Sequence, residues 1–131
     1  MAKKMEVPEA LGYTAEHEWV KVEGRRARVG VTDYAQDALT DVVFVELPKL
    51  GKVVKAHETL GVVESVKSVS DIFSPLAGKV VEVNTVLEET PELVNQDPYG
   101  KGWYCVLELA APDEVKNLMT AARYRAQTEH M

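Results

Sequence analysis

TLGVVESVKSVSDIF, residues 59–73, contains two short runs with the composition of β-strands, Thr59–Ser65 and Val69–Phe73. If the two runs pair as a hairpin, Val66 and Lys67 lie at or near its tip, which is the most exposed point of a small β protein. The turn has neither Asn-Gly nor Asp-Gly, and β-branched residues stand beside the bend. Strand pattern and turn chemistry by themselves therefore predict an exposed lysine on a β-hairpin.

A second hairpin is predicted nearer the N-terminus, from His17 to Val31. A run of strand-forming residues leads to Gly24, after which Ala27 and Val29 alternate with polar or small residues. This alternation is typical of a hairpin with one face in water.

A short helix is predicted over residues 33–39, because Thr32 offers an N-cap oxygen and apolar residues recur at helical spacing. The next segment, Val42–Leu47, is mostly β-branched and aromatic, and Pro48 closes it. We expect that segment to be a largely buried strand.

The remaining strand signals are short, and turn residues separate them at close intervals: Lys52–Val54, Lys79–Val83 and Trp103–Leu109. The last of these strands places Cys105 among core residues. Many short strands with regular turns predict an all-β barrel or sandwich.

Two further helices are predicted in the C-terminal half of the chain. Thr90 as an N-cap and Pro91 at the first helical position predict a single turn that ends near Asn95. Pro112 begins a C-terminal helix whose apolar residues follow the helical period: Val115, Leu118, Met119 and Ala122. We expect this helix to pack on the sheets through that stripe.

Length and charge limit the classes of function. The chain has 131 residues, 46% of them hydrophobic, and a mass of 14.5 kDa, which predicts a single domain over residues 1–131. Fifteen basic and 21 acidic residues give a net charge of −6, which disfavours nucleic acid and anionic membrane surfaces as partners. The basic cluster of Arg25, Arg26 and Arg28 has no interleaved aromatic residues in sequence, so we expect it to be ordinary surface.

No catalytic or metal-binding set of residues stands out. Cys105 falls on the apolar side of a predicted strand, whereas a reactive thiol is partly exposed. The histidines His17, His57 and His130 are far apart in the sequence and form no zinc-binding pattern. One cysteine and the lack of a signal-peptide pattern predict a reducing compartment, either the bacterial cytoplasm or the mitochondrial matrix.

Several motifs occur in order along the chain: His-Glu-Trp at 17–19, Gly-Val-Thr-Asp-Tyr-Ala-Gln at 30–36, Val-Val-Phe-Val-Glu-Leu-Pro at 42–48, Val-Glu-Ser-Val-Lys-Ser at 63–68 and Pro-Glu-Leu-Val-Asn at 91–95. This ordered series resembles the H proteins of the glycine cleavage system, a family of lipoyl carriers. The resemblance extends from about Gly12 to Tyr124, the expected core of the domain. It implies a mainly β, lipoyl/biotinyl-like barrel-sandwich hybrid of short antiparallel strands, with short helices and a C-terminal helix.

By this resemblance, Lys67 carries lipoic acid through an amide bond, and the chain itself is not an enzyme. A pyridoxal-phosphate-dependent glycine decarboxylase, the P protein, transfers an aminomethyl group to a lipoyl sulfur. A tetrahydrofolate-dependent aminomethyltransferase, the T protein, then removes that group and releases ammonia. Dihydrolipoamide dehydrogenase, the L protein, reoxidises the dithiol with NAD. The enzymes that attach lipoate are further expected partners.

The resemblance also implies a cleft that shelters the loaded arm from water. Glu18 and Asp71 are the carboxylates that suit an ammonium group there. Tyr34 stands where many relatives have histidine, and its hydroxyl can replace a ring nitrogen as donor or acceptor. The expected cleft residues are Glu18, Tyr34, Glu64, Ser65 and Asp71. Thr40 stands where relatives often have glycine, so we expect a different turn at that position.

Four alternative functions remain. A biotinyl domain has a similar fold, but its lysine is typically flanked by methionines, whereas Val66 and Ser68 flank Lys67 here. A lipoyl domain of a 2-oxoacid dehydrogenase is usually shorter and attached through linkers to other domains. A small thiol enzyme would use Cys105. An H-like carrier that relays lipoate to other enzymes is poorly distinguished by sequence.

Overall fold

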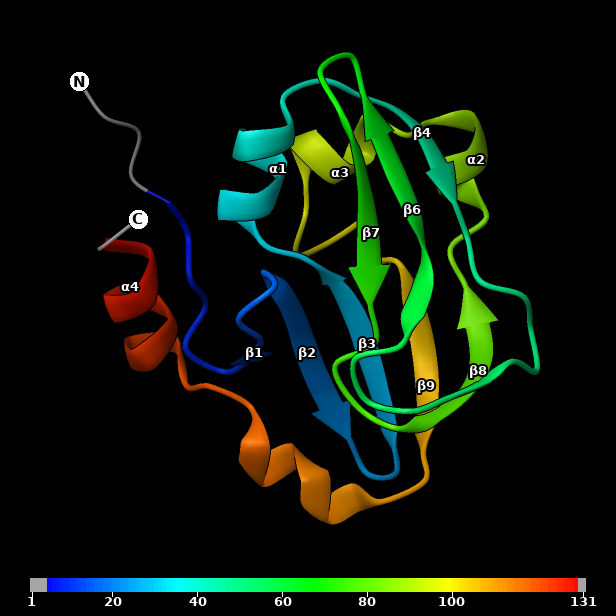
Figure 1. The fold of residues 1–131 in the computed structure, drawn as a ribbon, viewed down its shortest axis with the longest axis vertical. Coiled ribbons are helices and arrows are strands. Elements are labelled where there is room, and N and C mark those ends of the chain that lie inside the picture. Colours follow the sequence, from blue (N-terminus) through cyan, green and yellow to red (C-terminus); the bar gives the residue numbers. More distant parts are fainter. Residues whose placement is uncertain (1–4, 130–131) are drawn as a thin grey trace.

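Two antiparallel sheets face each other in the computed structural model, which describes residues 5–129 (Figure 1). The larger sheet has the strand order β1-β2-β3-β9-β8-β5: Gly12–Tyr13, Glu18–Glu23, Arg26–Val31, Cys105–Leu109, Gly78–Val83 and Val53–Val54. The smaller sheet has the order β4-β6-β7: Val42–Glu46, Thr59–Ser65 and Val69–Phe73. His130 lies outside the described residues.

Short helices lie around the two sheets. They are α1 (Asp33–Leu39), α2 (Val86–Glu89), α3 (Leu93–Gln96), the 3₁₀ helix η1 (Pro112–Asn117) and α4 (Ala121–Glu129). Helices α1 and α3 lie at the end of the molecule where the β6–β7 hairpin turns (Figure 1). None of the helices in the described part of the chain is long and apolar enough to cross a membrane.

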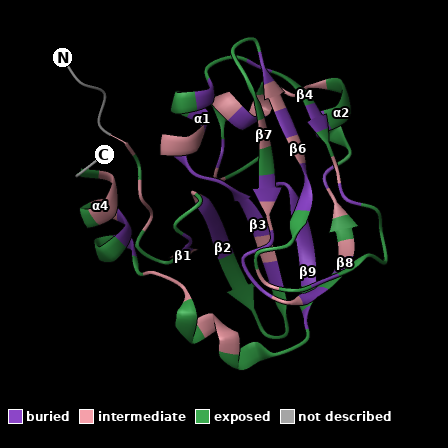
Figure 2. Ribbon diagram, viewed as in Figure 1, coloured by how far each residue is buried: buried purple, intermediate pink, exposed green. Residues whose placement is uncertain are grey.

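The main hydrophobic core lies between the sheets. Val29, Cys105 and Leu107 come from the larger sheet, and Val45 and Val63 come from the smaller one. All five are buried, and Figure 2 shows buried segments in both sheets. The mainly β architecture, and the burial of the thiol in it, are as predicted.

Both hairpins and the first helix are confirmed. Strands β2 and β3 pair antiparallel on either side of the turn at Gly24. Helix α1 covers Asp33–Leu39, and the Thr32 hydroxyl accepts a hydrogen bond from the Ala35 backbone N–H at 3.1 Å. Local signals suffice for these elements because each one is set by its own cap or turn.

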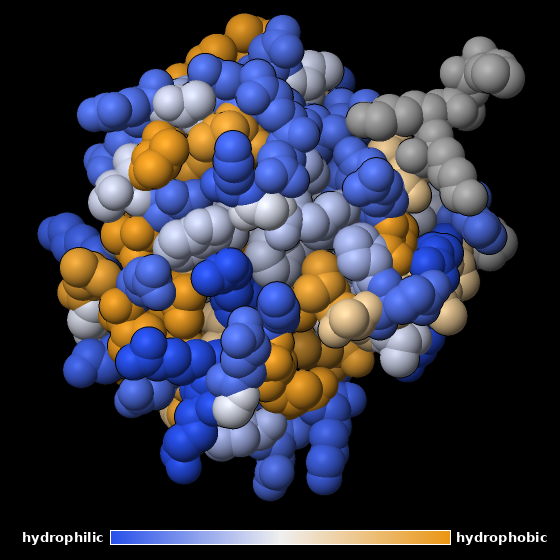
Figure 3. All heavy atoms as spheres, turned by 180° about the vertical axis from the view of Figure 1, so that it is seen from behind, coloured by the Kyte–Doolittle hydropathy of each residue, from blue (hydrophilic) through white to orange (hydrophobic). Residues whose placement is uncertain are grey.

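The other predicted strands are present with small boundary differences: Val53–Val54, Gly78–Val83 and Cys105–Leu109. Arg25 and Arg26 are exposed, as expected for surface, while the Arg28 guanidinium lies 5.0 Å from the centre of the Trp103 ring. Hydrophilic side chains cover much of the face opposite to that of Figure 1, with hydrophobic patches between them (Figure 3).

The prediction of a largely buried strand at Val42–Leu47 is wrong. Strand β4 is an edge strand with an irregularity between Val42 and Phe44, and the exposed fractions of Val43 and Phe44 are 53% and 48%. An edge strand has a neighbouring strand on one side only, so its apolar residues are not all buried.

The predicted cap at Thr90 is also wrong. Thr90 ends helix α2, which the sequence reading missed, and its backbone N–H donates to the Val86 carbonyl at 2.8 Å. Helix α3 begins only at Leu93, and its N-cap, Glu92, makes no side-chain capping bond. The predicted helical turn near Asn95 therefore exists, but it begins later than predicted because non-helical turns follow Thr90.

A single C-terminal helix is not formed. Its predicted length divides into η1 and α4, and the connection includes Met119, which pairs with Tyr13 through two backbone hydrogen bonds of 2.9 and 2.8 Å. This pairing to a distant strand overrides the local helical period. Ala122, a member of the predicted stripe, is exposed, and Ala121 and Tyr124 are the buried residues of α4.

Candidate functional site

The tip of the β6–β7 hairpin is fixed by the side chain of Ser65. Its hydroxyl accepts hydrogen bonds from the backbone N–H groups of Lys67 at 3.2 Å and Ser68 at 3.0 Å, and the Ser65 N–H donates to the Ser68 carbonyl at 2.8 Å. A serine hydroxyl thus takes the role that a backbone carbonyl has in an ordinary turn. Neither Val66 nor Lys67 has a positive φ, which explains how the turn closes without Asn-Gly or Asp-Gly.

Lys67 is exposed at this tip, as predicted. Its neighbours Val66 and Val69 are exposed as well, with fractions of 69% and 64%. The Val66 N–H donates to the Asp41 carbonyl at 3.0 Å, which attaches the tip to the segment between α1 and β4. The lysine is therefore an exposed amine on a backbone held at both sides of the turn.

A cleft of about 370 Å³ lies between the β6–β7 hairpin, helix α1 and the start of β2. It is lined by residues of all three parts, among them Glu18, Tyr34, Lys67 and Asp71. Much of the remaining wall consists of apolar side chains, including Val31, Leu39 and Ile72. Four of the six residues predicted from the sequence thus meet in one cleft.

Glu18 is the buried carboxylate of this cleft, with an exposed fraction of 2%. The Thr14 hydroxyl donates to its Oε1 at 2.6 Å, and the Phe73 backbone N–H donates to its Oε2 at 3.3 Å. Burial raises the pKa of Glu18 to about 7, and the two hydrogen bonds oppose that rise. Its charge at neutral pH is therefore sensitive to any cation that enters the cleft.

Tyr34 and His17 form an aromatic part of the cleft wall. Their ring centres are 4.6 Å apart and the ring planes are tilted by 30°. Asp71, on the edge strand β7, is exposed. The cleft thus combines one buried carboxylate, one exposed carboxylate and a ring pair beside an exposed lysine.

Glu64 and Ser65 are not among the residues that line the cleft. Glu64 lies between Phe44 and Val69 in the register of the smaller sheet. Ser65 is buried, and its hydroxyl holds the turn. Both residues support the hairpin that presents Lys67, and nothing in their positions supports a place in the cleft wall.

Three residues of the site were not predicted from the sequence. His17 lines the cleft, Thr14 binds Glu18, and Tyr124 contacts His17 from α4. His17 was within the His-Glu-Trp motif and could have been found there. Tyr124 lies 107 positions from His17, and no sequence signal joins residues at that separation.

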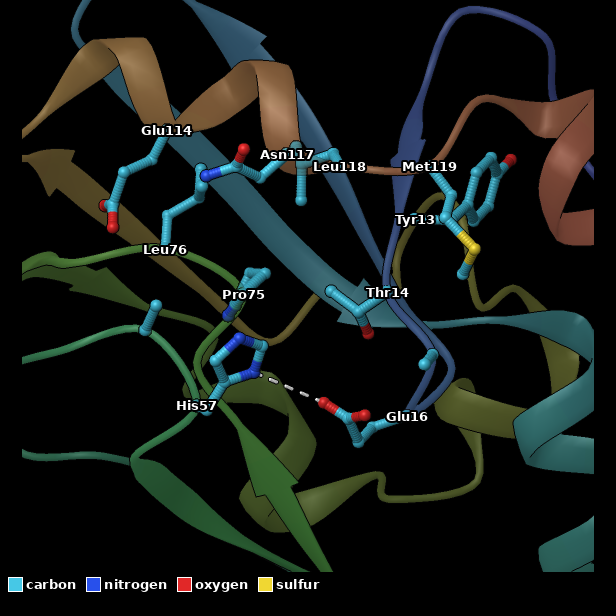
Figure 4. Close-up of a pocket in the computed structure, with 12 residues that line it drawn as sticks. Tyr13, Thr14, Glu16, His57, Pro75, Leu76, Glu114, Asn117, Leu118 and Met119 are labelled. Carbon is cyan, nitrogen blue, oxygen red and sulfur yellow. Dashed lines mark ion pairs between the residues drawn. The ribbon is translucent and has the colours of Figure 1, made fainter.

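A second, smaller cavity of about 230 Å³ lies between η1 and the loops around Glu16 and His57 (Figure 4). His57 Nδ1 is 3.5 Å from Glu16 Oε1 at its rim, and both side chains are substantially exposed. Glu16 is the one lining residue that this cavity shares with the cleft, and Lys67 is absent from its wall. The cavity is therefore separate from the lysine site.

Cys105 is fully buried, and burial raises the pKa of its thiol to about 12. A thiol in that environment remains protonated at neutral pH and is out of reach of a substrate. The thiol-enzyme alternative thus loses its nucleophile.

Two packed antiparallel sheets, with an exposed lysine at a hairpin tip beside a cleft that contains two carboxylates, define a barrel-sandwich domain of the lipoyl/biotinyl-like type. The family model described as "Glycine cleavage H-protein" matches residues 11–131. The chain belongs to the glycine cleavage H-protein family.

Known relatives are similar to this chain over nearly its whole length. The glycine cleavage system H protein of Symbiobacterium thermophilum is 59% identical over 123 residues, which cover 94% of this chain and 96% of that protein. The H protein of Bacillus subtilis is 51% identical over 125 residues, with coverages of 95% and 98%. The crystal structure of the H protein from Mycobacterium marinum has a TM-score of 0.86 at 42% identity and covers 94% of this chain and 99% of that one.

Proposed function

We propose that this chain carries lipoic acid in amide linkage to Lys67 and serves as the shuttle of the glycine cleavage system. It carries the aminomethyl group from the P protein to the T protein and is then reoxidised by the L protein. The observation that supports this proposal most directly is the exposed Lys67 side chain, which stands at the mouth of a cleft that contains two carboxylates.

The residues around Lys67 fit a lipoyl arm. A volume of about 370 Å³ falls in the range of ligand sites, about 300–1,000 Å³. The apolar part of the wall suits a hydrocarbon chain and sulfur, and the carboxylates suit an amine at its end. When bound, lipoic acid supplies a disulfide that is reduced and reoxidised and a sulfur that holds the transferred group.

The chain's own residues hold and shelter the arm. Glu18 and Asp71 attract a cation into the cleft, and the apolar wall excludes water. Because a nearby cation favours the ionised form of a carboxylic acid, entry of an amine lowers the pKa of Glu18 from about 7. Once Glu18 has released its proton, its carboxylate and the cationic amine form a charge pair in a site of low dielectric constant.

The chemistry in this proposal belongs to the partner enzymes, so the chain is a carrier and not an enzyme. P, T and L proteins each have to reach the same arm, which favours its attachment at an exposed tip over a site inside the fold. The enzymes that attach lipoate must reach the Lys67 amine itself. The bacterial relatives favour the bacterial cytoplasm over the mitochondrial matrix as the location.

Reconstitution with the P, T and L proteins and glycine tests the shuttle. We expect Lys67→Arg to abolish glycine decarboxylation, because arginine keeps the charge but cannot form the amide. The matched control is Lys79→Arg, another exposed lysine, on β8, which should keep full activity. Activity of Lys67→Arg would refute the proposal. A lipoylated wild-type protein that supports no glycine decarboxylation but donates lipoate to another enzyme would favour the relay function instead.

A further inference from the structure

Helix α4 contacts a residue of the cleft wall through one hydroxyl group. Tyr124 is 1% exposed, and its Oη lies 2.7 Å from Nδ1 of His17 and 2.7 Å from the hydroxyl oxygen of Thr32. His17 lines the cleft, and Thr32 caps the helix that carries Tyr34. A single phenol thus connects the C-terminal helix to a residue of the cleft wall and to the N-cap of α1.

The hydrogen bonds around this phenol fix where the protons lie. The buried Thr32 oxygen already accepts from the Ala35 N–H, and among the described residues the Tyr124 oxygen is the one acceptor for its proton. Thr32 therefore donates to Tyr124. The Tyr124 proton is then directed to Nδ1 of His17, which accepts it as an unprotonated ring nitrogen. The reverse arrangement would leave the buried Thr32 hydroxyl proton unpaired, which is costly.

The second ring nitrogen of His17 has no hydrogen-bond partner among the described residues. Every buried side-chain nitrogen or oxygen of the described residues has a partner, so this Nε2 is open to solvent. His17 lines the lysine cleft, and we infer that the solvent-accessible Nε2 is open on that side.

We propose that Tyr124 is a positioning residue that holds His17 as the neutral tautomer with its proton on Nε2, and that this N–H donates a hydrogen bond to the arm on Lys67. The proposal rests on the proposed function only for the identity of the arm. The arm's amide carbonyl and sulfur are acceptors, and the carboxylates of Glu18 and Asp71 cannot donate to them when ionised.

A neutral His17 also avoids repulsion of a cationic amine. Titratable groups that contact the ring or line the same cleft come from its own segment, from α1, from α4 and from the β6–β7 hairpin: Glu16, Glu18, Tyr34, Tyr124, Lys67 and Asp71. Burial lowers the pKa of His17, and Glu16 opposes this effect. Burial also raises the pKa of the Tyr124 phenol, so this donor keeps its proton.

Long-range ¹H–¹⁵N NMR spectra of the protein without lipoate test the tautomer. We expect His17 to be protonated on Nε2 at neutral pH in the wild type. Tyr124→Phe removes the donor to Nδ1, so the ring should become a mixture of tautomers and its pKa should rise by roughly 0.5–1 unit. Protonation on Nδ1 in the wild type, or an unchanged spectrum in Tyr124→Phe, would overturn the proposal.

Tyr13→Phe is the matched control. The Tyr13 ring stacks on Tyr124 at 4.8 Å, but its hydroxyl donates to the Pro8 carbonyl. This variant loses a buried hydroxyl from the same aromatic cluster and should leave the His17 tautomer unchanged. A change of tautomer in Tyr13→Phe would mean that general loosening of α4, and not the Tyr124 hydroxyl, controls the ring.

The contact with the arm is tested on lipoylated protein loaded by glycine decarboxylase. His17→Phe keeps a ring against Tyr34 and removes both nitrogens, so loss of amine from the loaded arm should accelerate roughly fivefold, the equivalent of one hydrogen bond of about 1 kcal/mol. An unchanged rate would refute the contact. Failure to acquire lipoate at all would instead refute the proposed function, while the NMR result would stand.

Discussion

Glu18 is a carboxylic acid in an environment that disfavours its charged form. Its carboxyl group is 2% exposed, and burial raises its pKa from 4.5 to about 7. The folded protein therefore binds a proton there between pH 4.5 and 7, whereas the unfolded chain does not. Glu18 thus contributes stability at low pH that is lost as the pH rises through 7.

This linkage gives a prediction for Glu18→Gln. Between pH 8 and pH 5, the free energy of unfolding of the wild type should rise by roughly 2–3 kcal/mol relative to that of the variant, because only the wild type gains the proton. Urea unfolding at several pH values measures this difference. Glu89→Gln, which removes an exposed carboxylate on α2, is the control and should follow the wild type. Parallel pH profiles for wild type and Glu18→Gln would contradict the assignment.

Ser65 is the second residue with a defined local role, because its hydroxyl accepts two backbone N–H groups of the tip. Ser65→Ala should destabilise the protein by about 1–2 kcal/mol and increase hydrogen exchange of the Lys67 and Ser68 amides. Ser68→Ala is the control, because its hydroxyl makes no hydrogen bond with the described residues, and it should leave exchange at Lys67 unchanged. Equal exchange in the wild type and Ser65→Ala would show that the hydroxyl does not hold the turn.

Among the elements, the segment from α1 to β4 carries backbone strain next to the site. Thr40 ends α1 with φ 64° and ψ −148°, a conformation that a β-branched residue rarely adopts. The next residue, Asp41, accepts the hydrogen bond from Val66 at the tip. The strained end of α1 is thus directly connected to the hairpin that presents Lys67.

Glycine at this position should relieve the strain. We expect Thr40→Gly to stabilise the protein by about 1 kcal/mol, which corresponds to a rise of about 3–5 °C in Tm. Thr40→Ala retains the Cβ atom and should give a clearly smaller increase. Calorimetry measures both variants, and a lower Tm for the glycine variant would contradict this account of the helix end.

Sequence patterns were sufficient for the elements that carry their own signals. Helix α1 has a capping hydroxyl at Thr32, and the β6–β7 hairpin has two β-rich runs of the right length. The C-terminal helix was predicted wrongly because Met119 pairs with Tyr13, more than 100 positions earlier. The burial of β4 was predicted wrongly because an edge position is a property of the whole sheet and not of the strand.

At the scale of the whole molecule, the cleft is assembled from distant segments. The resemblance of short motifs to a known family identified Glu18, Tyr34, Lys67 and Asp71, all of which line it. It did not identify the residues that connect the walls, since Tyr124 belongs to a helix with no such motif. The geometry of the site thus depends on packing that a linear pattern does not contain.

The two sheets share one core, so we propose that residues 1–131 form a single domain. Its main cluster contains fifteen buried residues of the described part of the chain: fourteen come from both sheets and three helices, and Tyr104 directly precedes β9. Thermal unfolding should therefore show one transition, with equal calorimetric and van't Hoff enthalpies. Two resolved transitions, or a calorimetric enthalpy well above the van't Hoff value, would contradict this proposal.

Peptide mass spectrometry of the protein made in lipoate-replete cells tests the central claim most directly. The account predicts lipoyl mass on the peptide that contains Lys67, on no other lysine of the wild type, and on no peptide of Lys67→Arg. Biotin on Lys67, lipoyl mass on a different lysine, or an unmodified Lys67 in those cells would contradict it.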